Sequence, residues 1–319
     1  MRTMLTERMN LKHPIVLAPM GSVAGGSLAA AVTRAGGLGL IGAGYGNSEW
    51  LERELDKCTG TSPFGVGFIT WSLARNSSAL DLAIDRSPDA VMFSFGDHRP
   101  YVKRVRDARV MIICQVQTVR DALYAVDAGA DVIVAQGTEA GGHGRDRSLF
   151  SLLPAVVDAV SPLPVLAAGG IVDGRGLAAA LVLGASGGLV GTRFMATSES
   201  LLPRIAKQRL VRATGDDTRR TRVPDIVRGY DWPPEYTGRA LSNRFIEFWH
   251  GRESTLHLNL SGQRALYKTA VAENDFDHAV IFAGEGLDGV NSIEPVARVM
   301  QRMVDEAETC LASTSCLRA

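Results

Sequence analysis

The feature that most constrains this chain is a repeated alternation of short apolar runs with longer, alanine-rich stretches. Runs that are apolar at consecutive positions predict strands buried on both faces, and the stretches between them predict crossover helices. The expected strands are Pro14–Ala18, Leu38–Gly42, Phe64–Phe68, Ala90–Phe95, Val110–Val116, Asp131–Ala135, Val165–Ala168 and Gly188–Val190. The alternation therefore predicts a parallel sheet of the α/β class.

The number of units separates two α/β architectures. Eight strands are typical of a (β/α)8 TIM barrel, and a chain of 319 residues can hold one barrel with an insertion. A doubly wound sheet would normally carry G-x-G-x-x-G after its first strand, whereas this chain has Ala18-Pro19-Met20-Gly21. We therefore expect the barrel and keep the doubly wound sheet as the alternative.

Helices are expected between the strands, and a separate insertion is expected near the end of the chain. The clearest predicted helices are Ser27–Ala35, Asn47–Cys58, Leu149–Val160 and Gly176–Leu183. From about residue 201 the sequence becomes arginine-rich and contains the turn Asp231-Trp232-Pro233-Pro234. We predict a helical insertion over 201–282 that covers the active-site side of a barrel formed by 1–200 and 283–319. Apolar residues at helical spacing between Ile293 and Leu311 predict a closing helix on the barrel.

The balance of charge favours a small-molecule partner. Lys plus Arg and Asp plus Glu number 34 each, so no net field attracts nucleic acid or an anionic membrane. No apolar run approaches the roughly 18 residues of a membrane span, and the first ten residues lack a signal peptide's apolar region. We expect a cytoplasmic protein. Cysteines 58, 114, 310 and 316 have no metal-ligand spacing, so we expect free thiols and no metal site.

Two glycine-rich loops follow the last two predicted strands. Ala168 is followed by Gly169 and Gly170, and Val190 is followed by Gly191 and Thr192. In α/β barrels these two loops commonly bind a phosphate group, because glycine lets backbone N–H groups approach the oxygens. The pattern predicts a bound phosphate ester, and tight turns without a ligand are the alternative.

One histidine stands out in the loop after the sixth predicted strand. His143 lies in Gly141-Gly142-His143-Gly144, and three neighbouring glycines provide little apolar cover. We therefore expect a displayed imidazole that takes or gives a proton, or that donates a hydrogen bond to an oxyanion. His98, after the fourth strand, is a second candidate on the same side of the barrel.

Six short segments along the chain form a set of motifs: Ala18-Pro19-Met20, Phe64-Gly65-Val66-Gly67, Ala135 to His143, Ala167-Ala168-Gly169-Gly170, Gly191-Thr192-Arg193-Phe194 and Ala283-Gly284-Glu285-Gly286. Together they resemble the nitronate monooxygenase family. The resemblance implies a (β/α)8 barrel that binds FMN and no metal, with His143 as the catalytic histidine. The implied FMN-binding residues are Ala18, Pro19, Met20, Gly67, Gln115, Gln136, Ala140, Gly141, Gly142, Gly169, Gly170, Gly191 and Thr192.

This chain departs from many relatives at three places. Gly67 stands where many carry Asn, and Gln115 stands where some carry Lys. The first motif is Ala-Pro-Met-Gly, whereas many members have Gln-Gly-Gly-Met. These differences bear on the flavin's potential and on the assignment to a subfamily.

The resemblance implies oxidation of alkyl nitronates with O2 to a carbonyl compound and nitrite. The same motifs also resemble FMN-dependent NAD(P)H:quinone reductases and enoyl-acyl-carrier-protein reductases, in which the arginines of the insertion could meet an acidic carrier or a nicotinamide phosphate. A solvated arginine face is the alternative for those residues. A non-catalytic flavin-binding protein is a further alternative, and a homodimer stays open.

Overall fold

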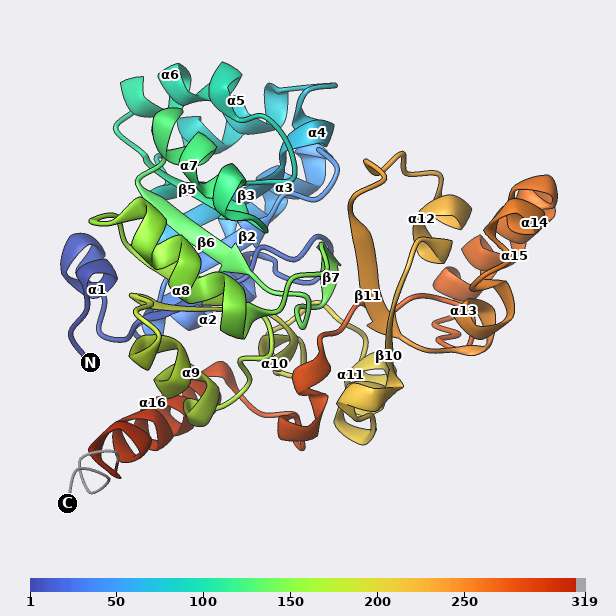
Figure 1. The fold of residues 1–319 in the computed structure, drawn as a ribbon. Helices are drawn as coiled ribbons and strands as arrows, with labels where there is room; N and C mark the ends of the chain where they lie inside the picture. Colours follow the sequence, from blue (N-terminus) through green and yellow to red (C-terminus); the bar gives the residue numbers. More distant parts are fainter. Residues whose placement is uncertain (314–319) are drawn as a thin grey trace.

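The computed structural model describes residues 1–313 and contains a barrel of eight parallel strands (Figure 1). The barrel strands are β1 (Ile15–Leu17), β2 (Gly39–Gly42), β3 (Phe64–Ile69), β4 (Ala90–Ser94), β5 (Met111–Val116), β6 (Val132–Gln136), β8 (Val165–Ala168) and β9 (Gly187–Val190). Their order is β1-β9-β8-β6-β5-β4-β3-β2. A parallel bridge between Val16 and Leu38 brings β2 back to β1 and closes the barrel. The predicted (β/α)8 architecture is confirmed.

The predicted element ends agree closely with the observed ones where the apolar runs are sharply bounded. The seventh predicted strand, Val165–Ala168, and the helix Leu149–Val160 match the structure at both ends. The other predicted strands differ by one or two residues, because backbone pairing stops before or after the apolar run does.

The barrel has two apolar layers, which explains why its strands are apolar at consecutive positions. Val16, Leu40 and Ile113 belong to the inner layer, whereas Ile15, Leu17 and Ile41 belong to the outer layer against the helices. Successive side chains of a strand point to opposite faces, so both kinds of position must be apolar here. The amino-terminal helix α1 (Met4–Met9) adds Leu5 to the inner layer.

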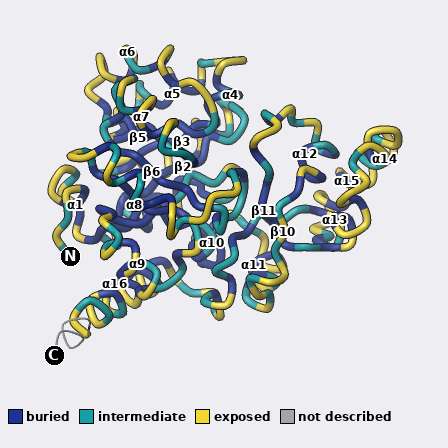
Figure 2. Tube along the Cα trace, in the orientation of Figure 1, coloured by how far each residue is buried: buried dark blue, intermediate teal, exposed yellow. Residues whose placement is uncertain are grey.

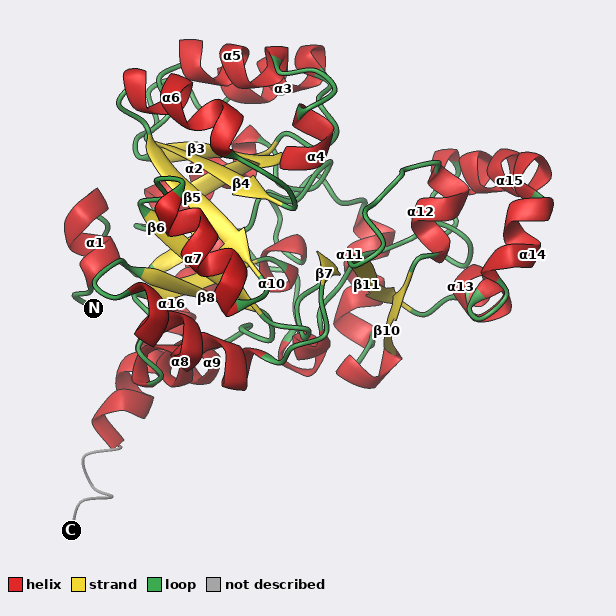
Figure 3. Ribbon diagram, turned by 45° about the horizontal axis from the view of Figure 1, so that its top comes forward, coloured by secondary structure: helices red, strands yellow, loops and turns green. Residues whose placement is uncertain are grey.

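Helices surround the strands, as Figure 3 shows in red around yellow. They are α2 (Gly26–Arg34), α3 (Ser48–Asp56), α4 (Thr70–Leu73), α5 (Ser78–Asp85), α6 (Arg99–Asp107), α7 (Val119–Asp127), α8 (Leu149–Val160), α9 (Gly174–Val182), α10 (Thr192–Met195) and α16 (Val296–Ser313). Helix α16 is the predicted closing helix, and it packs against α9 and α2.

Residues 201–282 contain two strands that the sequence analysis did not predict. The segment comprises α11 (Arg204–Arg212), the 3₁₀ turn η1 (Gly215–Asp217), β10 (Thr218–Thr221), α12 (Val223–Arg228), β11 (Thr237–Leu241), α13 (Arg244–Trp249), α14 (Glu253–Leu258) and α15 (Leu260–Ala272). A second 3₁₀ turn, η2 (Glu285–Gly289), follows it. The predicted helical insertion is present, and it also contains β10 and part of β11, which Thr and Arg residues without an apolar pattern form through long-range pairing.

The strands of this segment join it to the barrel. β11 pairs antiparallel with both β10 and β7 (Gly142–Gly144), and β7 lies in the loop that follows β6. Figure 1 shows α12 between the barrel and the pair α14 and α15, and Figure 2 shows much exposed surface on α14 and α15. The segment is therefore tied to the carboxyl ends of the barrel strands.

Three of the four cysteines lie in the described residues. Cys58 and Cys114 are buried free thiols and Cys310 is a partly buried one, whereas Cys316 lies outside the described residues. Burial raises the pKa of the Cys58 thiol to about 11. Within residues 1–313, no helix is long and apolar enough to cross a membrane.

Candidate active site

The backbone of His143 is fixed from two sides. Strand β7 pairs with β11 so that His143 lies opposite Gly238. On the barrel side, the side-chain amide of Gln136, the last residue of β6, donates a hydrogen bond to the carbonyl oxygen of His143 at 2.9 Å. The histidine is thus held between a barrel strand and the segment 201–282.

The imidazole of His143 is buried, with 8% of the residue exposed, so the prediction of a displayed ring was wrong. The indole of Trp232 stacks on it, with ring centroids 3.4 Å apart and an angle of 5° between planes. Phe282 lies 5.4 Å away in a tilted arrangement, and Phe95 presents its ring at 6.4 Å. The flanking glycines do not bury the imidazole, as expected, but aromatic residues far away in the sequence do.

A buried carboxylate accompanies the histidine. Nε2 of His143 lies 3.0 Å from Oδ1 and 2.9 Å from Oδ2 of Asp225, which is on the short helix α12. Nδ1 of His143 has no hydrogen-bond partner among residues 1–313. Sequence reasoning missed Asp225, because no motif surrounds it and only the fold brings it to the histidine.

Burial lowers the pKa of His143, and Asp225 opposes that shift. Arg228 and Arg220 add to the lowering through their positive charge. A buried imidazole favours its neutral form, because the low dielectric penalises the imidazolium. At neutral pH, His143 is therefore a neutral imidazole with one nitrogen free to accept a proton.

The predicted glutamines form one hydrogen-bonded group. Oε1 of Gln136 accepts from the side-chain amide of Gln115 at 3.1 Å and from that of Gln117 at 2.7 Å. Gln136 thereby connects β5, β6 and the backbone of His143. Gln117 was not predicted, although it lies two residues from Gln115 and directly after the end of β5.

The glycine loops after β8 and β9 lie side by side, because these two strands are paired. Gly169 and Gly170 have φ angles of 115° and 70°, which only glycine adopts readily. Among the described residues, the backbone N–H groups of Gly170, Gly191 and Thr192 have no hydrogen-bond partner. Free N–H groups on adjacent loops are what a phosphate group requires, so the loops suit the predicted ligand.

The first motif lies beside the second of these loops. β1 pairs with β9, and a Cβ atom built on Gly191 would lie 3.4 Å from both Cβ of Ala18 and Sδ of Met20. On the other side, a Cβ atom at Gly67 would overlap ring carbons of Pro19. The ring of Pro19 thus fills the space that an asparagine side chain at position 67 would need.

The loop that contains Ala140 and Gly141 packs directly on the segment after Phe282. A Cβ atom at Gly141 would lie 2.6 Å from the backbone of Ala283 and of Gly284, so this close approach requires glycine at 141. The N–H of Gly284 in turn donates to the hydroxyl oxygen of Thr192 at 3.0 Å. These contacts explain why the Ala283 to Gly286 motif accompanies the two loops.

Arginines of the segment 201–282 reinforce the loop after β6. Arg220 donates to the hydroxyl and carbonyl oxygens of Thr138, and Arg239 donates to the same carbonyl at 2.9 Å. Arg239 also pairs with Glu285 at 2.8 Å. Burial lowers the pKa of Arg220 to about 10. Arg220 therefore stabilises the site's framework and is not part of a solvated arginine face.

His98 has a different setting from His143. Its ring stacks at 6.0 Å on Phe93, a residue of the outer core layer, and lies edge-on at 6.2 Å from Tyr124 of α7. Burial lowers its pKa. The structure does not bring it together with His143, and its contacts are those of a packing residue.

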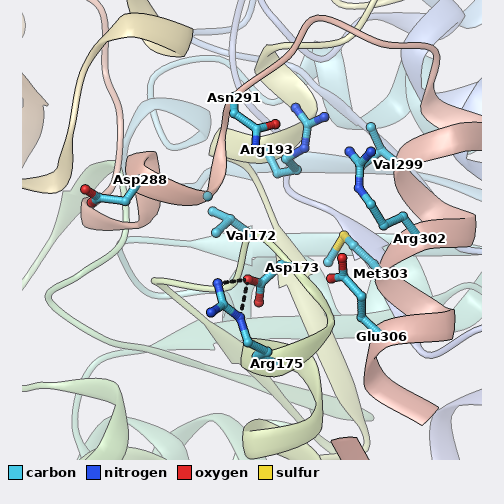
Figure 4. Close-up of a pocket in the computed structure, with 11 residues that line it drawn as sticks. Val172, Asp173, Arg175, Arg193, Asp288, Asn291, Val299, Arg302, Met303 and Glu306 are labelled. Atoms are coloured by element: carbon cyan, nitrogen blue, oxygen red, sulfur yellow. Dashed lines mark hydrogen bonds and ion pairs between the residues drawn. The ribbon is translucent and has the colours of Figure 1, made fainter. Parts of the chain in front are cut away.

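A cavity of about 250 Å³ lies behind the loop after β8 (Figure 4). Its lining carboxylates are already engaged within the protein. Asp173 accepts from the backbone of Gly176 and pairs with Arg175, and Glu306 accepts from the N–H of Gly174 at 2.9 Å. These bonds hold α16 against the start of α9, so we assign the cavity's polar groups a structural role.

The fold and the site together define a barrel enzyme that places a buried histidine at the carboxyl ends of parallel strands. The family model described as nitronate monooxygenase matches residues 2–72 and 69–306. The nitronate monooxygenase npaC of Metarhizium robertsii is 32% identical over 95% of this chain and 93% of the relative. The protein belongs to the nitronate monooxygenase family and is an oxidoreductase.

Solved structures agree with this assignment. FabK from Thermotoga maritima has a TM-score of 0.88 and 29% identity, and the match covers 99% of both chains. A nitroalkane oxidase from Streptomyces ansochromogenes has a TM-score of 0.79 and 31% identity, over 96% of this chain and 99% of that one. The likeness extends over residues 201–282 as well as the barrel.

Proposed function

We propose that this protein is an FMN-dependent nitronate monooxygenase in which His143 handles the proton of the substrate. The observation that carries the proposal is a neutral, buried imidazole with Nε2 engaged and Nδ1 free. This group stands at the strand ends of a barrel whose family acts on nitronates.

The residues present fit FMN. The free N–H groups of Gly170, Gly191 and Thr192 would hold its phosphate, with Gly169 completing the turn. The remaining proposed FMN contacts are Ala18, Pro19, Met20, Gly67, Gln115, Gln136, Ala140, Gly141 and Gly142. When bound, FMN supplies the electron-transfer chemistry, and the protein supplies position and proton handling.

The chain's own residues define what happens at the substrate. A nitronate has already lost the acidic proton of the carbon next to the nitro group, so Nδ1 of His143 accepts that proton only when the neutral nitroalkane enters the site. In its protonated form, His143 donates a hydrogen bond to a nitro oxygen of the nitronate. The rings of Trp232, Phe282 and Phe95 exclude water around the imidazole. An apolar surrounding of this kind suits an alkyl chain, so we propose alkyl nitronates as substrates and O2 as the co-substrate.

Nitrite release and oxygen consumption with ethyl nitronate test this proposal. The FMN-loaded protein should produce nitrite and a carbonyl compound. With nitroethane, the conjugate acid of ethyl nitronate, His143→Ala should keep FMN bound but lose about 10²- to 10⁴-fold in kcat, the usual range for one general acid or base. Full turnover by His143→Ala would contradict the assigned role, and absence of nitrite with the unaltered protein would contradict the reaction.

A second candidate function is an FMN-dependent NAD(P)H:quinone or enoyl-acyl-carrier-protein reductase. One observation supports this second candidate: the fold resembles that of FabK at least as closely as it resembles that of the nitroalkane oxidase. In this case, His143 would protonate or orient the acceptor. Reduction of the protein's flavin by NADH or NADPH separates this candidate from the first.

We also propose a functional division of the chain. Residues 1–200 and 283–319 would form the FMN-binding barrel, and residues 201–282 would cover its active-site side. The pairing of β11 with β7 and the position of Trp232 support this division. A cytoplasmic location and a homodimer stay proposals, which fractionation and light scattering would test.

A further inference from the structure

We propose that Asp225 is a positioning residue that holds His143 through Nε2 and thereby makes Nδ1 the nitrogen that exchanges a proton with the substrate. The inference rests on the proposed function, because it names the working atom of the same site. It assigns a role to a residue outside the barrel strands and outside every segment that carries the family resemblance.

The geometry fixes which nitrogen carries the proton. An ionised carboxylate only accepts hydrogen bonds, so the nitrogen 2.9 Å from Oδ2 and 3.0 Å from Oδ1 must be the donor. Nε2 of His143 therefore bears hydrogen, and in the neutral ring Nδ1 carries the lone pair. Both side chains are nearly enclosed, with 7% exposed for His143 and 4% for Asp225, so water competes little for this bond.

The remaining surroundings leave only Nδ1 for chemistry. One face of the ring is covered by Trp232 at 3.4 Å, and Phe282 lies 5.4 Å from the ring. With Nε2 engaged, Nδ1 is the ring nitrogen without a hydrogen-bond partner among residues 1–313. The imidazole thus presents a single reactive edge.

Helix α12 is suited to hold a carboxylate in a fixed place. Val223 and Val227 on this helix are buried in a small core with Tyr267 of α15. Gly229 ends the helix with a φ angle of 76°, and the N–H groups of Gly229 and Tyr230 both donate to the carbonyl oxygen of Asp225. The chain then turns back to deliver Trp232, so one short helix positions both partners of His143.

The charges around the ring set the sign of the pH effect. Asp225 and Arg228 from α12 and Arg220 from β10 act on His143, and only Asp225 raises its pKa. His143 must be neutral to accept the proton of a nitroalkane, so turnover of nitroethane falls below the pKa of His143. Loss of the carboxylate lowers that pKa further, which moves the acidic limb of the kcat profile to lower pH.

Asp225→Asn tests the inference, because asparagine keeps the shape of the side chain and removes its charge. With nitroethane as substrate, we expect kcat to fall by about 10- to 100-fold with a small change in KM, as expected for loss of orientation of a catalytic imidazole. We also expect the acidic limb to move to lower pH. Asp225→Glu should recover part of the loss. Unchanged kcat and an unmoved limb in Asp225→Asn would overturn the inference.

A matched control comes from an exposed pair in the same segment. Asp275 accepts a hydrogen bond from Nδ1 of His278 at 2.6 Å and does not contact His143. Asp275→Asn removes an Asp–His pair of similar composition, so we expect its kcat and pH profile to match the unaltered protein. A shift as large as that of Asp225→Asn would attribute the effect to general electrostatics and overturn the inference.

A second measurement does not depend on turnover. In protein labelled with ¹⁵N-histidine, NMR should show His143 protonated at Nε2 and bare at Nδ1 near neutral pH, with the signal assigned by its loss in His143→Gln. The Nε2 proton should be shifted downfield by its charged partner and should move upfield in Asp225→Asn. A proton on Nδ1 with bare Nε2 would overturn the inference. If nitronates are not substrates but the Nε2 signal is as expected, the proposed function fails and the positioning role stands.

Discussion

Gly67 on β3 has no room for a side chain, because the ring of Pro19 lies against the position that a Cβ atom would take. Gly67→Ala forces either the proline ring or the strand to move, and Gly67 lies in the paired centre of the barrel between β2 and β4. Overpacking of a well-packed interior costs about 1–3 kcal/mol. We therefore expect the free energy of unfolding to fall by about that amount.

Thermal unfolding followed by circular dichroism measures this effect. A change of 1 kcal/mol shifts Tm by about 2–4 °C in domains of roughly 150–250 residues, so Gly67→Ala should melt several degrees below the unaltered protein. FMN affinity should weaken as well, because Pro19 is displaced. Pro19→Ala combined with Gly67→Ala should recover part of the lost stability.

Gly262 provides a control with the opposite sign. It lies in α15, and apart from its chain neighbours and the backbone of its own helix, no atom lies within 4 Å of the position that its Cβ would take. Gly262→Ala should raise stability by roughly 0.5–1 kcal/mol, the usual gain for replacing glycine in a helix. If Gly67→Ala melts at or above the unaltered protein, the reasoning about Pro19 is refuted.

Three further predictions address the site and its surroundings. Trp232→Ala uncovers His143 and relieves the burial that lowers its pKa, so the acidic limb of the kcat profile should move to higher pH. A limb that stays in place would show that the stacked indole does not cause the lowered pKa of His143. Burial lowers the folded-state pKa of His13, His98 and His143, so the unfolded chain binds more protons below about pH 6.5. The urea concentration at the midpoint of unfolding should therefore decrease when the pH is lowered from about 7.5 to about 5. A midpoint that stays constant over this range would contradict the linkage. Gln136→Leu leaves two neighbouring glutamine amides and one backbone carbonyl without a partner, so urea unfolding should show a loss of about 1–3 kcal/mol, and a loss below about 0.5 kcal/mol would show that the network is dispensable.

The barrel was predictable from sequence because each of its strands is buried on both sides. Val165–Ala168 and the other barrel strands are continuous apolar runs because both faces of each strand are buried. Such a run can be recognised in the sequence without knowledge of the tertiary packing. The glycine pair Gly169-Gly170 at the end of β8 was predictable for a related reason. The positive φ angles of Gly169 and Gly170 need residues without a side chain, which the sequence shows directly.

The surroundings of His143 could not be predicted in this way. His143 was found because glycines flank it, yet its burial depends on Trp232 and its hydrogen bond on Asp225, 82 residues away. Strand β11 pairs with β7 over a similar separation in sequence, and Thr237–Leu241 lacks the alternating apolar pattern that would predict a strand. Such contacts depend on the tertiary fold, and a single sequence carries no local signal for them.

Gly67 illustrates the opposite case. Its difference from relatives is visible in the sequence as a missing amide, which suggests a change in the flavin's surroundings. The structure gives a packing reason, since Pro19 occupies the space in question. The first motif and the third strand must therefore change together.

Anaerobic stopped-flow mixing of the FMN-loaded protein tests the central claim most directly. The protein is mixed in parallel with ethyl nitronate, with NADH and with NADPH, and the flavin absorbance is followed. We predict that ethyl nitronate bleaches the flavin of the unaltered protein within the turnover time and that neither nicotinamide acts. With nitroethane in place of the nitronate, we predict that His143→Ala slows the bleaching. Rapid bleaching by a nicotinamide with no response to ethyl nitronate would contradict the account and assign the protein to the reductases.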